Sequence, residues 1–202
     1  MTFAAVDLYW LPLGAGDNTG CVRVNGRVFE AFTAYVGRRD RCDLYHSALQ
    51  VHLDGATHVI EMAPVWSLAG PDHGAVCEGP VGLRLLGRSR LFRYEVRCWR
   101  DGFIPDAADA VDSPQRLSTD PHRAARVLDL APSFPTATWG RDEMRTGDMW
   151  NSNSLVSWLL ARSGHAMDVV APPPHGRAPG WAAGLVVASR PGHASAAAPP
   201  SA

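Results

Sequence analysis

The sequence lacks a strong excess of either charge. Lysine and arginine together number 19 against 20 aspartates and glutamates, and the formal net charge is -1. A near-neutral chain is not expected to bind nucleic acid or an anionic membrane through its overall charge. The sequence also lacks any run that approaches the roughly 20 apolar residues needed to span a bilayer. We therefore expect no nucleic-acid partner and no membrane span.

Targeting and disulfide signals are missing as well. The N-terminus has neither the basic start nor the uninterrupted apolar core of a signal peptide, so a cytoplasmic location is expected. The four cysteines form no CxxC pair and are widely spaced, which favours reduced thiols over a disulfide framework; they are Cys21, Cys42, Cys77 and Cys98.

Signals for a cofactor are also absent. His73 and Cys77 have a spacing that would suit two metal ligands, but no second pair with ligand spacing follows. No glycine pattern typical of phosphate or dinucleotide binding precedes a predicted helix. The sequence predicts no metal site and no cofactor.

The first half of the chain is rich in strand-like segments. They cover residues 21–37, 44–53, 57–66 and 89–99, each with β-branched or aromatic residues bounded by Gly, Asp or Pro. Asp54-Gly55 marks a tight turn between the second and third segments. Alternation along 44–53 places Tyr45 and Ser47 on one side and His46 and His52 on the other. The basic residues from Arg84 to Arg100 alternate with apolar ones, as on the solvated face of a strand.

The second half is helical at two places. Asp120 followed by Pro121 predicts a helix over about 121–130. A second helix is predicted from the apolar spacing after Asn151, with Gly164 as its C-terminal cap. Residues 171–190 are rich in proline and glycine and then briefly apolar, which suggests a wrapping arm that ends in a last strand. We expect one α+β domain over residues 1–190, in which an antiparallel sheet packs against the second helix, and a disordered tail over 191–202.

Four small polar residues, Asn151, Ser152, Asn153 and Ser154, open the second helix. Ser152 suits the N-cap position, because Asn and Ser satisfy the free amides of a first helical turn. The same position places a hydroxyl beside backbone donors and the positive end of the helix dipole, where an acyl-transfer nucleophile would find an oxyanion site.

A serine nucleophile needs a base, and the strand at 44–53 offers His46. His52 lies on the same face but roughly 20 Å further along a straight strand. The group that orients the imidazole is expected to be His58 or Glu61, which face opposite ways on the next strand, so only one of them can serve. For either strand histidine, the alternative is a partly buried residue with one hydrogen bond.

Asn151 and Asn153 are further candidates, as hydrogen-bonding groups for a ligand. The tryptophans near the helix start, Trp150 among them, would either line an apolar cleft or lie in the core. A ligand in such a cleft would be a small molecule, a lipid or a peptide.

The order of these motifs resembles the circularly permuted branch of the papain-like NlpC superfamily, which includes lecithin retinol acyltransferase-like proteins. In that branch a strand histidine precedes the nucleophile, and the cysteine nucleophile opens a helix in an Asn-Cys-x-x-apolar motif. Residues 151–155, Asn-Ser-Asn-Ser-Leu, match that motif with serine in place of cysteine. The resemblance covers about residues 28–164 and is closest to an uncharacterised bacterial group with Asn-Ser-Asn-Ser/Thr before an apolar helix.

The resemblance implies a hydrolase or acyltransferase that acts on an amide, ester or thioester, with Ser152 as nucleophile, His46 as base, and His58 or Glu61 as orienter. Serine departs from the family pattern, because a hydroxyl is almost wholly un-ionised at neutral pH and needs strong base assistance. The alternative is a catalytically inactive binding module of the same fold. A third hypothesis is that the polar motif only caps a helix.

Overall fold

The computed structural model of the protein describes residues 3–14, 30, 35, 38, 40–65, 74–104 and 106–191. Its strands are β1 (Ala5–Pro12), β2 (Asp43–Leu53), β3 (Ala56–Pro64), β4 (Ala75–Pro80), β5 (Arg93–Arg100), β6 (Val111–Ser118) and β7 (Gly176–Arg177). The α-helices are α2 (Pro121–Leu130), α3 (Ser152–Arg162) and α4 (Trp181–Ser189). Short 3-10 helices are η1 (Arg84–Arg88), η2 (Arg90–Phe92), η3 (Ala107–Asp109), η4 (Ala131–Ser133) and η5 (Met167–Val169). The architecture is therefore α+β, as the sequence predicts.

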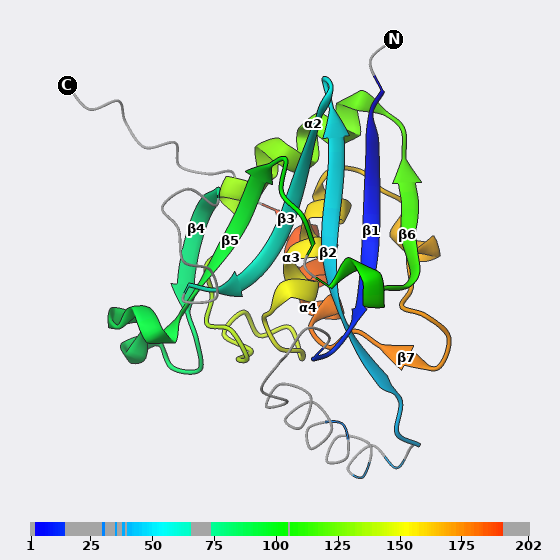
Figure 1. The fold of residues 1–202 in the computed structure, drawn as a ribbon. Coiled ribbons are helices and arrows are strands. Elements are labelled where there is room, and N and C mark those ends of the chain that lie inside the picture. Colours follow the sequence, from blue (N-terminus) through cyan, green and yellow to red (C-terminus); the bar gives the residue numbers. More distant parts are fainter. Residues whose placement is uncertain are drawn as a thin grey trace, which may run out of the picture.

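One sheet contains all the strands, and the helices pack on one of its faces (Figure 1). The strand order is β4-β5-β3-β2-β1-β6, and each pair of neighbours along this path is antiparallel. The two-residue strand β7 pairs in parallel with the start of β2. We call the side covered by α2, α3 and α4 the helix face, and the other side the outer face.

The tight turn predicted at Asp54-Gly55 joins β2 to β3. Both residues have positive φ, 51° and 77°, as the two-residue turn of a right-twisted hairpin requires. The register continues from Leu53 opposite Ala56 to Leu49 opposite Ile60. The turn and the two strands beside it are confirmed.

Alternation along β2 divides two apolar clusters, as predicted. Tyr45, Leu49 and Val51 belong to the main core between the sheet and the helices. Ala48, from the alternate positions, belongs to a smaller cluster on the outer face with Leu11, Val59 and Ile104. Both faces of the central strands are therefore partly covered by apolar packing.

The predicted helix over 121–130 is confirmed as α2. Asp120 caps it by accepting a hydrogen bond from the backbone N–H of His122 at 2.9 Å, and Pro121 is its first residue. At that position proline costs no hydrogen bond, because the first amides of a helix lack intrahelical acceptors.

Helix α3 is the central helix of the domain. Every residue from Ser152 to Leu160 is buried, because the sheet covers one side of the helix and α4 covers another. Gly184 makes the close approach of α4 feasible, since a Cβ there would overlap Ser157 Oγ and the carbonyl oxygen of Ser154. The helix predicted after Asn151 is confirmed, and it ends before Gly164, whose φ is 83°.

The structure corrects three predictions. The last apolar run, expected to be a strand, is helix α4; a short apolar run does not distinguish helix from strand by periodicity alone. The segment 89–99 enters the sheet only at Arg93, because η2 precedes it. The segment 21–37 lies outside the described residues except for Glu30 and Tyr35, which are helical and not extended. Residues 192–202 of the predicted tail also lie outside the described residues.

Candidate functional site

The Asn-Ser-Asn-Ser segment forms a helix cap, but Asn151 and not Ser152 is the N-cap residue. Asn151 Oδ1 accepts hydrogen bonds from the backbone N–H groups of Asn153 (2.9 Å) and Ser154 (3.3 Å). Ser154 Oγ accepts the backbone N–H of Asn151 at 3.1 Å, which completes a reciprocal capping box. The prediction of Ser152 as the cap is wrong by one residue, because Ser152 is the first residue of the helix itself.

Asn153 joins three parts of the fold. Its Nδ2 donates to the carbonyl oxygens of Tyr45 and Pro179, each at 2.9 Å, and its Oδ1 accepts from Ser47 Oγ at 2.8 Å. Asn151 Nδ2 donates to the same Pro179 oxygen at 2.8 Å. Asn153 is almost fully buried, so each of these bonds satisfies a group that water does not reach. Both asparagines act as braces between α3, β2 and the segment before α4.

Ser154 and Asp148 hold the start of α4 in place. Ser154 Oγ lies 2.8 Å from the carbonyl oxygen of Gly180, and Asp148 Oδ2 accepts the backbone N–H of Gly180 at 2.8 Å. Gly180 has a φ of 89°, and a Cβ there would overlap the Asn151 side chain. Ser154 and Asp148 therefore hold Gly180, at the start of α4, against the start of α3. The sequence alone did not indicate this contact.

Ser152 is the one member of the motif whose side chain makes no hydrogen bond within the part of the chain that the structure describes. It is buried in the first turn of α3. It follows the N-cap residue Asn151 directly. No hydrogen bond joins its hydroxyl to a described side chain of the predicted catalytic set.

His46 lies on the other side of the sheet from Ser152. Its neighbour Ser47 points to the helix face, where it bonds to Asn153, so His46 points to the outer face. There it is paired in register with Leu11, a member of the outer apolar cluster. Burial lowers the pKa of His46 to about 4, which leaves the imidazole neutral at pH 7. The structure does not bring this histidine to the serine.

The two predicted orienters are also separated by the sheet. His58 is opposite Val51 and shares the helix face, with its Nδ1 buried and without a hydrogen-bond partner. Ser47 marks the level at which the start of α3 meets β2. Val51, the partner of His58, is four positions further along that strand, which is about 13 Å. Glu61 points to the outer face and bonds to Arg97 at 3.2 Å. Burial raises the pKa of Glu61, while Arg97 opposes that shift.

Trp150 is a core residue and does not line a cleft. Its ring stacks on Phe134 with centroids 4.9 Å apart, and its Nε1 donates to the carbonyl oxygen of Pro135 at 3.0 Å. Trp158 packs edge-on against the same Phe134 ring. The core alternative given for these tryptophans is the one that the structure matches.

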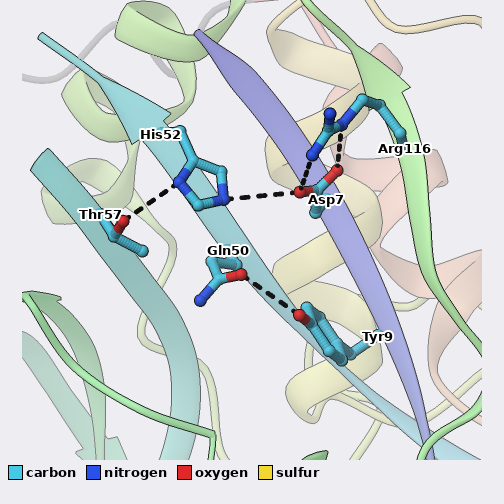
Figure 2. Close-up of polar contacts among 6 residues, drawn as sticks. All are labelled: Asp7, Tyr9, Gln50, His52, Thr57 and Arg116. Carbon is cyan, nitrogen blue, oxygen red and sulfur yellow. Dashed lines mark hydrogen bonds and ion pairs between the residues drawn. The ribbon is translucent and has the colours of Figure 1, made fainter. Parts of the chain in front are cut away.

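A different set of polar side chains gathers on the outer face, around the β2–β3 hairpin (Figure 2). We call it the outer polar cluster; its members are Asp7, Tyr9, Gln50, His52, Thr57 and Arg116. It draws on the neighbouring strands β6, β1, β2 and β3. Only His52 was singled out from the sequence, and then only as a distant neighbour of His46.

The Asp7 carboxylate is the centre of the outer polar cluster. It is almost fully buried and accepts two parallel hydrogen bonds from Arg116, from Nε to Oδ1 and from Nη2 to Oδ2, both at 2.8 Å. His52 Nε2 lies 3.5 Å from Asp7 Oδ2, and His52 Nδ1 lies 3.1 Å from Thr57 Oγ1. Nearby, the Tyr9 hydroxyl donates to Gln50 Oε1 at 3.2 Å.

Electrostatic and aromatic contacts link the members of the outer polar cluster. The hydrogen bonds from Arg116 to Asp7 raise the pKa of the guanidinium, and burial together with Asp7 raises the pKa of Tyr9. The Phe3 ring lies 5.2 Å below the Arg116 guanidinium and 5.4 Å from the His52 ring. The bidentate pair with Asp7 and the aromatic ring below the guanidinium fix the orientation of Arg116.

The sequence offered no local signal for the outer polar cluster. Asp7 and Arg116 are 109 positions apart and meet only because β1 and β6 pair at that register. His52 and Thr57 face each other across the hairpin. A pattern search within one segment cannot detect contacts that depend on the pairing of distant strands.

Comparison with protein-family models, curated proteins and solved structures finds no match for this chain. The resemblance to permuted papain-like proteins therefore stays a hypothesis. Among the described residues, none of the helices has the length and apolar character needed to cross a membrane.

Proposed function

We propose that the protein is a non-catalytic binding module. The observation that carries this proposal is the separation of the predicted nucleophile and base. Ser152 belongs to α3, which packs on the helix face, whereas His46 points to the outer face. General-base catalysis needs hydrogen-bond contact, directly or through one water. The three other members of the polar motif are occupied in capping α3 and bracing α4. The motif is thus explained by architecture, without a nucleophile.

The outer polar cluster is the ligand site that we propose. Its groups are already held by other protein groups: Arg116 by Asp7, His52 by Asp7 and Thr57, and Gln50 by Tyr9. Groups held in place before a ligand arrives lose little conformational entropy on binding. About half of the Arg116 side chain remains exposed, and its Nη1 has no hydrogen-bond partner among the described residues.

A carboxylate-bearing small molecule or peptide is the ligand class that suits these groups. The free edge of a guanidinium matches a carboxylate, and the Gln50 side-chain amide adds hydrogen-bonding capacity beside it. The exposed Phe3 ring would cover an apolar part of the ligand. The ligand would lie on the outer face at the hairpin end of the sheet.

The test uses N-acetylated tripeptides with a free C-terminal carboxylate, and the same peptides amidated. In NMR spectra that observe arginine Nε–H and histidine ring signals, the free acids should shift Arg116 and His52, and the amides should not. Arg116→Gln should abolish the shifts, whereas Arg123→Gln, at a half-buried arginine of α2, should leave them unchanged. Equal shifts from acids and amides, or no shift from any peptide, would contradict the proposal.

A second function is favoured by one observation, the row of hydroxyl, imidazole and carboxylate formed by Thr57, His52 and Asp7. This order is that of an acyl-transfer triad. Against it, Arg116 already neutralises Asp7, which weakens the stabilisation of an imidazolium. Hydrolysis of p-nitrophenyl acetate that is lost in Thr57→Val and retained in Thr57→Ser would favour the enzyme over the binding module.

A further inference from the structure

The segment between β4 and β5 exposes large apolar side chains beside arginines. We call residues 83–92 the β4–β5 loop; it contains η1 and η2. Leu85 and Leu91 are 78% and 62% exposed, and Leu83, Leu86 and Phe92 are also exposed. The sequence pattern predicts the solvated face of a strand here, but the segment forms two 3-10 helices that leave its apolar side chains exposed as well. Exposed apolar side chains gathered in this way mark an interaction surface.

The charge of this loop is entirely positive. Arg84, Arg88 and Arg90 are exposed, and none of them forms an ion pair with the described residues. No acidic residue occurs between Glu78 and Glu95. Arg93, the first residue of β5, differs from these loop arginines because it pairs with Glu78 at 3.0 Å. A chain that is neutral overall therefore carries a local cationic surface.

The loop is closed and held at its base. The backbone N–H of Val81 donates to the carbonyl oxygen of Phe92 at 2.8 Å, and that of Gly82 donates to Trp139 at 3.0 Å. Within the loop, successive turns are closed by bonds from Leu86 to Leu83 and from Ser89 to Leu86. The apolar and cationic side chains are thus presented by an ordered backbone.

The loop projects from the edge of the sheet. In Figure 1 its two turns, in green beside β4 and β5, extend beyond the ends of these strands. β4 is the first strand in the sheet order and β6 is the last, so the loop and the outer polar cluster lie toward opposite edges. A ligand at one would leave the other accessible.

We propose that the β4–β5 loop docks the protein on the surface of an anionic lipid bilayer. Leucine and phenylalanine side chains that project from a convex loop can enter the boundary between headgroups and acyl chains, while arginines at the same level pair with lipid phosphates. A protein partner would need a concave acidic surface that matches the shape of the loop, whereas a lipid bilayer can deform around a projecting loop. The absence of acidic side chains along the whole loop fits an anionic surface of large extent.

The first experiment is cosedimentation of the full chain with vesicles of phosphatidylcholine alone, and of phosphatidylcholine with 30% phosphatidylglycerol. The wild type should bind the anionic vesicles and not the neutral ones, and added salt should weaken binding. Arg88→Gln with Arg90→Gln should weaken partitioning by about 25-fold, from about five-fold for each arginine. Leu85→Ser with Leu91→Ser should weaken it by about ten-fold or more.

The matched control is Arg100→Gln with Val169→Ser, which changes one exposed arginine and one exposed aliphatic residue outside the loop. It should bind as the wild type does. Thermal melting of all variants establishes that each one is folded. No wild-type binding to anionic vesicles would overturn the proposal, as would equal binding to neutral vesicles. Binding that survives the leucine changes would overturn it too, because charge alone would then explain the attraction.

Discussion

Asn151 and Ser152 are adjacent but differ in what they contribute. Asn151 accepts two backbone N–H groups at the start of α3 and donates to Pro179, whereas the Ser152 hydroxyl has no hydrogen-bond partner among the described residues. The energetic value of a polar residue at a helix start depends on whether it is the N-cap, because only there does the side chain replace the missing acceptors.

Replacement of these two residues should therefore have unequal effects. Asn151→Ala should lower the free energy of unfolding by about 1–2 kcal/mol, through loss of the cap. Ser152→Ala should change it by less than about 0.5 kcal/mol. Urea unfolding followed by circular dichroism measures both. The opposite order would show that Ser152 is the true cap.

His46 is a residue whose burial should be visible as pH dependence. Its pKa is lowered to about 4 in the folded protein from 6.5, its ordinary value. As pH falls below 6.5, the unfolded chain takes up a proton that the folded protein does not take up until about pH 4. Stability should therefore decrease between these values, by about 3 kcal/mol at most.

The measurement is the free energy of unfolding at pH 7 and pH 4.5 for the wild type and for His46→Gln. Burial also lowers the pKa of His165, so the wild type alone does not isolate one histidine. The loss of stability on acidification should be smaller in His46→Gln than in the wild type. His122→Gln, a change at an exposed residue of α2, serves as the control and should follow the wild type. Identical losses in all three proteins would mean that His46 is not desolvated.

At the scale of elements, the contact between α3 and α4 is set by small residues. Gly184 faces Ser157, whose hydroxyl bonds to the carbonyl oxygen of Trp181 at 2.8 Å. The two helices approach closely at that position because Gly184 has no Cβ. The sequence of α4 shows no amphipathic pattern, because the helix has only three buried positions, Ala183, Gly184 and Val187.

Gly184→Ala should destabilise the protein, although alanine favours a helix over glycine by about 1 kcal/mol. The added methyl would overlap the backbone oxygen of Ser154, so α4 must move, at a cost of about 1–3 kcal/mol. Val186→Ala, on the exposed side of α4, should change stability by less than about 0.5 kcal/mol. Chemical unfolding tests both, and a more stable Gly184→Ala variant would refute the close packing.

At the scale of the whole molecule, features encoded within one segment were predictable and features that depend on distant pairing were not. The Asp54-Gly55 turn, the alternation along β2 and the start of α2 at Asp120-Pro121 are local, and the structure has all three. Which face of the sheet receives α3 is decided by contacts such as Ser47 with Asn153, 106 positions apart. For this reason the structure does not bring His46 to Ser152: α3 packs on the helix face, and His46 points to the outer face.

The central claim is that the Asn-Ser-Asn-Ser motif builds the fold and performs no acyl transfer. It is tested most directly by incubating the folded protein with a fluorophosphonate probe and mapping adducts by peptide mass spectrometry. We predict no adduct on Ser152, because the residue is largely buried and no imidazole of the described residues is hydrogen-bonded to its hydroxyl. An adduct on Ser152 that disappears in His46→Gln would contradict the account and restore the serine hydrolase.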